Sequence, residues 1–460
     1  MISSLTKWLV DNYQSKTILC QFAIFSSYMY KFTYNHFMKI HIDIDCFFVS
    51  AARIKEPSLE GKAVAIGGRS DMKIFDSEAK KQTINLENSG SFVPIFYKAY
   101  EEKDDIDAFK DSDGRVRGIL TTSSYEARRY GVKTAMSIRE ALTLCPHLVI
   151  KAPNMSLYQK LSHELHEFLQ SKIPLVEQAS IDEFYGDLSG WVEDSDVPSF
   201  IATLRDEIKE VIKLPVSIGA AKTRYIAKLA TTYAKPYGCR VVFENELESF
   251  IEKIPVSEFA GIGKSMKEKL LSAQIHTLGE LSRRRGTLES WGPYAKELYL
   301  RVCGYRDDEI TTKHVRKSIG ISRTFDPLYN RDELRRRVHV LTRHLSYAIL
   351  KLKVIPTVFT LSLNYEMSQK SHKNISICEI FTEKKFDSLC LKLFSEADIH
   401  KRLHVIRISI NCSSFTRESR KELSLIGFED DQKMHRLTNH SQEIREKYGI
   451  DMLKWGSELC

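Results

Sequence analysis

Helix and strand patterns alternate in the first half of the chain in an order that restricts the possible folds. Residues 156–173 have the apolar spacing of an amphipathic helix, and residues 175–190 alternate as a β-hairpin. A second helix is predicted over 200–214, followed by a strand over 215–221. Helices segregated from strands in this way are typical of an α+β domain, and we expect that fold class here.

Acidic side chains stand at two places in this predicted sheet. Residues 39–50, KIHIDIDCFFVS, predict another strand, and the period of two places Asp43 and Asp45 on one face. Asp182 and Glu183 lie at the predicted hairpin turn. Hard divalent cations such as Mg²⁺ prefer oxygen ligands, and a pair of them about 4 Å apart can activate a hydroxyl and stabilise a leaving pyrophosphate. Either acidic pair alone is common in purely structural strands and turns.

Length and composition indicate a soluble multidomain protein. The 460 residues correspond to about three domains at roughly 150 residues each. Apolar residues make up 43% and charged residues 28%, which excludes a disordered or collagen-like chain. The nine cysteines form no CxxC pair, so we expect no structural zinc and a reducing, cytoplasmic location. Residues 1–37 are rich in aromatics; they predict either a peripheral apolar helix or sequence upstream of a true start at Met38.

The remaining segments extend the same α+β pattern. A strand is predicted over 62–68, and a strand, a turn and a helix over 118–132. Residues 71–117 between them have no clear pattern; we interpret their acidic part, 101–113, as a solvated loop insertion without an assigned function. Residues 254–282 predict two short helical pieces around the tripeptide GIG.

A second α+β domain is predicted near the C-terminus. Residues 357–366 and 404–412 alternate as strands, and residues 384–396 predict a helix. Residues 416–460 form a charged tail, in which 445–459 is interpreted as a packing helix.

Six separated motifs occur along the chain in the order IDIDCFF, SYEARRYGV, ASIDEFYGDLS, SIGAAKTRYIAKLATTYAKPYG, FAGIGKSMKEKL and VRKSIGISRTF. Together they resemble the Y-family translesion DNA polymerases of the bacterial polymerase IV and V kind. The resemblance covers Lys39 to about Phe415 and leaves the 71–117 insertion outside it. It implies a right-hand polymerase with palm, fingers, a helical thumb containing a helix-hairpin-helix, and a C-terminal little-finger α+β domain.

The resemblance implies domain boundaries along the chain. They are an N-terminal extension over 1–37, a palm over 38–50 and 155–245, fingers over 51–154, a thumb over 246–312, a linker and little finger over 313–415, and a C-terminal tail over 416–460.

The resemblance also implies a catalytic site. Asp43, Asp182 and Glu183 would be its catalytic, metal-binding carboxylates, and the Ile44 carbonyl would add a ligand for two Mg²⁺ ions. Asp45 matches a recurrent acid beside the site and is not expected to be a ligand.

Other matched positions imply contacts with nucleotide and DNA. Phe48 stands at the steric-gate position, where a ring against C2′ of the sugar excludes a 2′-hydroxyl. Residues that would bind the nucleotide triphosphate are Thr122, Tyr125, Arg128 and Lys235. Residues that would bind DNA are Gly261, Gly263, Lys264, Arg316, Lys317 and Arg323.

The tail peptide ELSLIGF at 422–428 resembles a sliding-clamp-binding motif and would bind through Leu423, Leu425 and Phe428. It departs from the usual pattern, because Glu422 stands where Gln is expected and Gly427 precedes Phe428.

The predicted function is therefore low-processivity, template-directed DNA synthesis past damaged bases, from dNTPs onto a primer 3′-hydroxyl. The expected partners are primer–template DNA, dNTPs, the sliding clamp and other damage-response proteins, with no membrane, and the expected state is a monomer. One alternative is a scaffold or DNA-binding subunit of a mutasome from the same family, although such relatives typically lose the acids retained here. Another is a different palm-domain enzyme such as a nucleotidyl cyclase, which would not need the GIG turn.

The positive charge is concentrated in one region. The chain has 68 Lys and Arg against 60 Asp and Glu, a net charge of +8. Residues 313–353 contain eleven basic and three acidic residues, which equals the whole excess. This concentration predicts a phosphate-binding stripe with salt-sensitive, sequence-independent affinity for DNA, or a solvated basic helix without that role.

Overall fold

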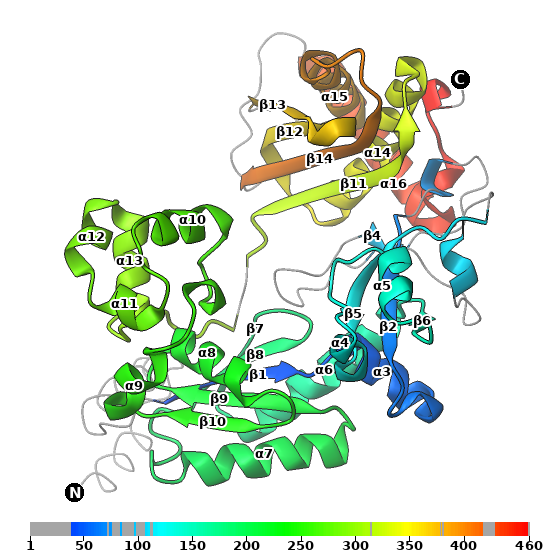
Figure 1. Ribbon diagram of the computed structural model, residues 1–460. Helices are drawn as coiled ribbons and strands as arrows, with labels where there is room; N and C mark the ends of the chain where they lie inside the picture. The colour runs from blue at the N-terminus through cyan, green and yellow to red at the C-terminus, as the bar shows by residue number, and fades with distance from the viewer. Residues whose placement is uncertain are drawn as a thin grey trace, which may run out of the picture. The chain divides into compact units, whose positions relative to one another are not determined.

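The chain folds into two compact units. The computed structural model describes residues 38–70, 73–75, 83–84, 96–97, 106–110, 114–312, 315–377, 379, 381–416 and 428–458 (Figure 1). The first unit comprises Met1–Glu56 and Tyr158–Lys313, and the second comprises Pro57–Leu157 and His314–Cys460. Each unit therefore combines two stretches that are far apart in the sequence.

The first unit is built on a five-stranded sheet in the order β10-β9-β1-β8-β7. Its strands are β1 (Lys39–Ile44), β7 (Leu175–Gln178), β8 (Glu183–Asp187), β9 (Val216–Ala221) and β10 (Cys239–Val242). The central β1 pairs antiparallel with both β8 and β9. Helices α7 (Val197–Val211) and α8 (Arg224–Ala234) pack on β9, and every residue of β9 is buried (Figure 1). Gly219 permits the contact with α8, because a Cβ there would lie 2.2 Å from the Ala227 carbonyl oxygen.

A group of short helices completes the first unit. They are α9 (Leu247–Ile251), α10 (Lys264–Ser272), α11 (Leu278–Ser282), α12 (Arg285–Ser290) and α13 (Pro293–Val302). Leucines from these helices form one buried cluster. The predicted helical pair around GIG is only partly right, because α10 follows the tripeptide whereas only a 3₁₀ turn, Val256–Glu258, precedes it.

The strand predicted over 39–50 is wrong in its second half. The chain leaves β1 after Ile44, Cys46 adopts a left-handed conformation (φ 46°, ψ 44°), and helix α3 (Phe47–Lys55) begins at the next residue. The hairpin β7–β8 and helix α6 (Met155–Lys172) are confirmed.

The second unit contains a three-stranded sheet in the order β5-β2-β6. It is formed by β2 (Val64–Gly68), β5 (Ile119–Ser123) and β6 (Val149–Lys151), with helices α4 (Tyr125–Arg129) and α5 (Ile138–Leu144). The predicted strand, turn and helix at 118–132 are therefore confirmed. The solvated loop interpretation is wrong for Phe109 in the acidic part of the insertion, because this side chain is fully buried in the core of this sheet.

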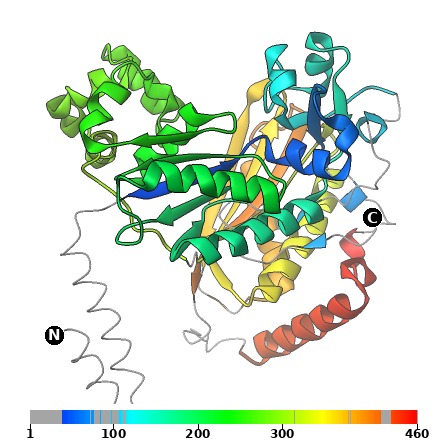
Figure 2. The ribbon, with the colours of Figure 1, turned by 90° about the horizontal axis from the view of Figure 1, so that it is seen from below.

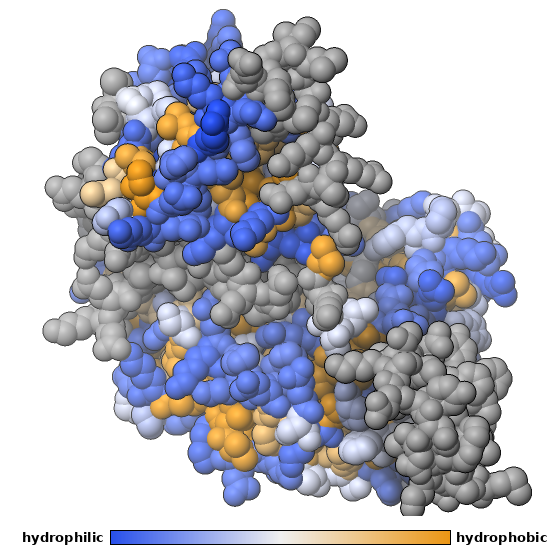
Figure 3. All heavy atoms as spheres, turned by 180° about the vertical axis from the view of Figure 1, so that it is seen from behind, coloured by the Kyte–Doolittle hydropathy of each residue, from blue (hydrophilic) through white to orange (hydrophobic). Residues whose placement is uncertain are grey.

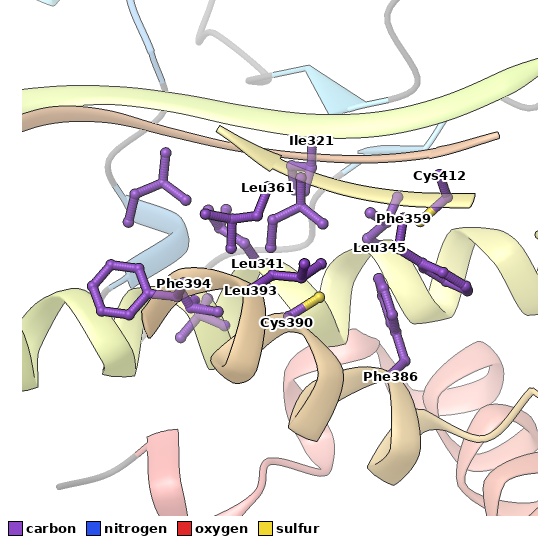
Figure 4. Packing of buried hydrophobic residues seen from close by; sticks show 14 of the residues in the cluster. Ile321, Leu341, Leu345, Phe359, Leu361, Phe386, Cys390, Leu393, Phe394 and Cys412 are labelled. Carbon is purple, nitrogen blue, oxygen red and sulfur yellow. The ribbon is translucent and has the colours of Figure 1, made fainter. Parts of the chain in front are cut away.

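The second unit also contains a four-stranded antiparallel sheet in the order β11-β14-β12-β13. Its strands are β11 (Ser318–Leu328), β12 (Ile355–Tyr365), β13 (Lys370–Ser376) and β14 (Val405–Thr416), and helices α14 (Arg331–Lys351) and α15 (Glu383–Ala397) accompany them. Side chains from the sheet and the two helices interdigitate in one hydrophobic core (Figure 4). The predicted second α+β domain is confirmed.

The C-terminal tail folds back onto this domain. Helix α16 (Phe428–Tyr448) is followed by two 3₁₀ turns, so the single helix expected over 445–459 is wrong (Figure 2). The Arg343 guanidinium, 1% exposed, donates to Glu458 at 2.8 Å and to Asp451 at 2.9 Å. Arg445, also buried, donates to Glu383 at 2.6 Å. The tail is therefore held by buried ion pairs, as packing residues would be.

Replacing Arg343 with methionine is expected to destabilise the C-terminal domain by about 3–5 kcal/mol, because Glu458 would keep a buried charge without a partner. Arg335→Met is the control, since Arg335 pairs with Asp332 at an exposed position where a pair contributes about 0.5 kcal/mol. Urea unfolding of both variants measures the difference. Equal destabilisation would contradict a structural role for the buried pair.

Among the coloured residues in Figure 3, hydrophilic side chains predominate and hydrophobic ones form separate patches. Among the described residues, no helix combines the length and the hydropathy that crossing a lipid bilayer requires.

Candidate active site

Three carboxylates come together where β1 and β8 meet. Asp43 and Glu183 are directly opposite one another in the antiparallel register. The Ile44 amide donates to the Asp182 carbonyl oxygen at 3.0 Å, so the hairpin turn lies against the end of β1. Residues almost 140 positions apart in the chain therefore share one edge of the site, and Ile44 is the last residue of its strand.

The turn that carries two of these acids is fixed by Ser180. Its hydroxyl oxygen accepts from the backbone amides of Asp182 at 3.2 Å and Glu183 at 3.0 Å. The same hydroxyl donates to the Asp182 carboxylate. A small hydroxylated residue before the acids thus orders both the backbone and one carboxylate.

Two lysines of one helix region neutralise the acids. The Lys235 ammonium lies 2.5 Å from Asp43 Oδ1, and the Lys228 ammonium lies 2.6 Å from both Glu183 oxygens. Sequence reasoning identified Lys235 but missed Lys228. No helical spacing links the two lysines, because Lys228 lies within α8 whereas Lys235 is the extended residue that follows its last residue, Ala234.

The burial of the carboxylates changes their proton affinity. Burial raises the pKa of Asp43 to about 7 despite the nearby Lys235, and burial also raises the pKa of Asp182. Burial would raise the pKa of Glu183 too, but His41 and Lys228 outweigh it and lower that pKa to about 2. Because burial lowers the pKa of His41 to about 4 and its Nε2 is 3.9 Å away, we assign Lys228 as the main partner.

The donor set fits a hard divalent cation. Oxygen donors gather from two strands, and two of the three acids are unfavourable as bare anions, so a bound cation would stabilise their ionised forms. Within the described part of the chain, no three His, Cys, Asp or Glu side chains already form a metal-binding cluster; the two lysines lie on the carboxylate oxygens instead.

Asp45 has a different environment from its neighbours. Its carboxylate accepts hydrogen bonds from the Ser217 hydroxyl at 2.9 Å and from the Tyr237 amide at 2.7 Å, and it is 2% exposed. Asp45 is therefore held by hydrogen bonds within the fold, and its exclusion from the metal ligands stays a prediction.

Phe48 lies on the first turn of α3, shortly after the site carboxylate of β1. Its half-buried ring stacks on Tyr158, with centroids 4.2 Å apart and planes 12° apart, and contacts Phe47. Two aromatic neighbours therefore constrain the plane of this ring.

The expected triphosphate contacts of the fingers lie in the second unit, on β5 and α4. Thr122 is on β5, and Tyr125 and Arg128 are one turn apart on α4. The exposed Arg128 donates from Nε to the Ser123 carbonyl at 3.1 Å and stacks over Tyr125 at 5.0 Å. These contacts keep the Tyr125 hydroxyl and the Arg128 guanidinium on one face of α4.

The GIG turn leads directly into α10. Gly261 has φ of +101°, which glycine adopts without strain, and Gly263 is the N-cap residue. The Tyr294 hydroxyl donates to the Gly261 carbonyl. Gly261, Gly263 and Lys264 are all exposed, as phosphate contacts must be.

The basic residues of 313–353 are less exposed, and so less accessible to DNA phosphates, than the sequence alone suggests. Lys317 is exposed, but Arg316 is half-buried and Arg323 is only 7% exposed, with Nη1 donating to the Ser322 carbonyl at 2.9 Å. Arg343 is buried in the ion pairs described above. Further cations of this region, each paired with an acid, are Arg331, Arg335, Arg336 and Arg337. Five of the eleven cations of 313–353 therefore pair with acids, three of them with Asp332 or Glu333 of the same helix, and the phosphate-binding stripe stays a prediction.

Several expected sites lie outside the described residues. They include residues 1–37, Lys313 and the tail positions Leu423 and Leu425, together with the side chain of Phe428.

Family models and sequence relatives both match this chain, and the relatives are DNA polymerases IV. The impB/mucB/samB family model matches residues 42–232, and the model of that family's C-terminal domain matches residues 316–425. DNA polymerase IV of Shewanella frigidimarina is 31% identical over 288 residues, which are 62% of this chain and 68% of that protein. DNA polymerase IV of Bacillus anthracis is 26% identical over 431 residues, which are 91% of this chain and 93% of that protein.

The fold of this chain is also similar to solved Y-family DNA polymerase structures. A Y-family DNA polymerase chimera of Dbh and Dpo4 superposes with a TM-score of 0.64 at 22% identity, over 83% of this chain and all of that one. An insertion ternary complex of Dbh DNA polymerase superposes with a TM-score of 0.51 at 19% identity, with the same coverage.

Proposed function

The chain belongs to the impB/mucB/samB family of Y-family translesion DNA polymerases, and from this membership we propose that Asp43, Asp182 and Glu183 form its catalytic site. The protein is a DNA-directed DNA polymerase that binds primer–template DNA and dNTPs and depends on divalent metal. The observation that carries the site assignment is the convergence of three carboxylates at the adjoining ends of β1 and β8.

The finer proposal concerns the metal. Asp43, Asp182, Glu183 and the Ile44 carbonyl would hold two Mg²⁺ ions, which when bound activate the primer 3′-hydroxyl and neutralise the leaving pyrophosphate. The Ser180 bonds hold Asp182 and the backbone of Glu183 in place before any cation arrives. A preorganised site of this kind avoids reorganisation during the reaction.

Lys235 and Lys228 have complementary roles in this proposal. In the free chain they are the counter-ions of Asp43 and Glu183. A cation on the carboxylates would release the Lys235 ammonium, which could then bind a triphosphate oxygen. Lys228 would keep Glu183 ionised, because an ammonium beside a buried carboxylate favours the charged form.

The division into units supports the proposed domains. The first unit would contain palm and thumb, and the second would contain fingers and little finger. The chain passes between units at Glu56–Pro57 and Leu157–Tyr158, close to the proposed limits of the fingers at 51 and 154.

Exposed Gly261, Gly263 and Lys264 would bind a DNA phosphate through the thumb, and exposed Lys317 would contact the duplex from the little finger, with Arg316 and Arg323 in supporting positions.

Arg128→Ala is expected to raise the apparent KM for dNTP about tenfold, because a guanidinium–phosphate contact contributes roughly 1.5 kcal/mol. The neighbouring Arg129→Ala is the matched control, since it removes the same charge from the next helical position. Steady-state insertion kinetics measure both variants. Equal KM values for Arg128→Ala and the unmodified chain would remove Arg128 from the nucleotide site.

Binding of the sliding clamp through Leu423, Leu425 and Phe428 remains a proposal based on the tail sequence. Deleting residues 422–428 is its test, because clamp-stimulated synthesis should then fall to the unstimulated rate.

The mutasome scaffold alternative is not favoured, because the family relatives are named polymerases and all three acids are retained.

A further inference from the structure

Two residues of the insertion are buried in a core far from it in sequence. Ile74 and Phe75, in the 3₁₀ turn Lys73–Phe75, are 4% and 6% exposed. They belong to the hydrophobic core of the four-stranded C-terminal domain, together with Phe325 and Leu334. The segment that precedes them belongs to the β5-β2-β6 sheet, so the chain leaves one domain to contribute to the core of another.

Specific contacts hold Phe75 in that core. Its ring meets Phe325 edge to face, with centroids 6.3 Å apart. The Arg337 guanidinium lies over both rings, 4.9 Å from the centroid of Phe75 and 4.5 Å from that of Phe325. Arg336 donates to the Phe75 carbonyl oxygen at 3.1 Å. Aromatic and cation–π contacts of this kind add to the burial of the ring.

Polar contacts flank the aromatic cluster on both sides. The Thr324 amide of β11 donates to the Ser70 hydroxyl at 3.2 Å. Arg117, at the other end of the insertion, lies 3.8 Å from Asp326. Ser70, just before the insertion, and Arg117, its last residue, therefore contact the same strand, β11.

The insertion is also anchored in its own domain. Phe109 is fully buried in the core of the β5-β2-β6 sheet. A Cβ at Gly67 would lie only 2.5 Å from its ring, so this glycine leaves the space that the ring occupies. The insertion thus carries one aromatic anchor for each of two cores.

We propose that Ser70, Ile74, Phe75 and Arg117 form a clasp that holds the C-terminal domain through its residues Thr324, Phe325, Asp326 and Arg337. The clasp joins this domain to the proposed fingers domain without DNA. The linker after residue 312 joins the C-terminal domain to the first unit along the chain. A further connection raises the effective concentration of one part near the other. When the enzyme holds DNA, the clasp therefore slows the departure of the little finger from the duplex.

Hydrogen exchange of the full-length, DNA-free protein tests the clasp itself. The Thr324 amide reports directly, because Ser70 is its acceptor. In Phe75→Ala, exchange at Thr324 should rise about tenfold, since losing the buried ring favours local opening. Phe415→Ala is the matched control, because it removes a partly buried ring from the same core outside the clasp and should leave Thr324 protected. Equal exchange at Thr324 in Phe75→Ala and in the unmodified chain would overturn the clasp.

A charge swap tests the contact without disturbing the core. Arg117→Glu should accelerate exchange at Thr324, and the double variant Arg117→Glu with Asp326→Arg should restore protection. Failure of the swap to restore protection would remove Arg117 from the clasp.

The consequence for DNA binding rests on the proposed function and has a separate readout. Phe75→Ala should raise the Kd for primer–template DNA roughly fivefold and shorten synthesis per binding event, as loss of a tether predicts. The rate of single-nucleotide insertion at saturating DNA should not change. Unaltered Kd with accelerated exchange would overturn the functional role. A wild-type chain that extends no primer would refute the proposed function while the exchange result still decided the clasp.

Discussion

Replacing Glu183 with alanine is expected to slow Mg²⁺-dependent primer extension by at least about a thousandfold, equivalent to roughly 4 kcal/mol of transition-state stabilisation. The change removes two carboxylate oxygens from the proposed cation site and leaves the Lys228 ammonium without its partner. Asp182→Ala should have the same effect, because Asp182 lies on the same turn. Single-turnover insertion of one nucleotide measures the loss without interference from DNA release.

The control for this prediction lies on the same strand. Asp187 is the last residue of β8, and its carboxylate accepts only a local bond from the Ser189 amide among the contacts described for it. Asp187→Asn should extend primers at the unmodified rate. Normal extension by Glu183→Ala would contradict the assignment of the carboxylate site.

Phe48→Ala is expected to raise the use of ribonucleotides relative to deoxynucleotides by about a hundredfold, or roughly 3 kcal/mol. A flat ring beside C2′ leaves no room for a 2′-hydroxyl, and alanine at this position would open that space. The measurement is the ratio of kcat/KM for a ribonucleotide and its deoxynucleotide with the same template base.

The Tyr158→Phe variant is the control for Phe48→Ala, because Phe48 stacks on the Tyr158 ring. The variant keeps the ring on which Phe48 stacks at 4.2 Å and removes only the hydroxyl. Sugar discrimination should therefore stay unchanged in Tyr158→Phe. If Phe48→Ala discriminates as well as the unmodified chain, another residue excludes the 2′-hydroxyl.

Local patterns predicted the elements whose neighbours lie close in sequence. The hairpin β7–β8 and helix α6 follow directly from periodicity. Periodicity failed at α3, because the alternation of 39–45 runs into two phenylalanines that suit a strand equally well. The left-handed Cys46 and the bonds that hold Asp45 from Ser217 and Tyr237 turn the chain instead, and those partners come from more than 170 positions away.

Burial of charge was the least predictable property. The eleven cations of 313–353 suggested a DNA-facing stripe, whereas Arg343 pairs with Glu458, which is 115 residues further along the chain. The insertion is a second example. Its local sequence does not indicate that Phe75 joins the core of the C-terminal domain, and the family resemblance does not cover it. Tertiary contacts at long sequence separation decide both cases.

In our proposal, Asp43, Asp182 and Glu183 together hold two divalent cations beside the incoming nucleotide. Counting bound Mn²⁺ by electron paramagnetic resonance, with primer–template and a non-reacting dNTP analogue, tests it most directly. The unmodified chain should bind two ions per complex, and Asp43→Ala and Glu183→Ala should each bind fewer while still holding DNA. Two ions bound with unchanged affinity in these variants would contradict the claim.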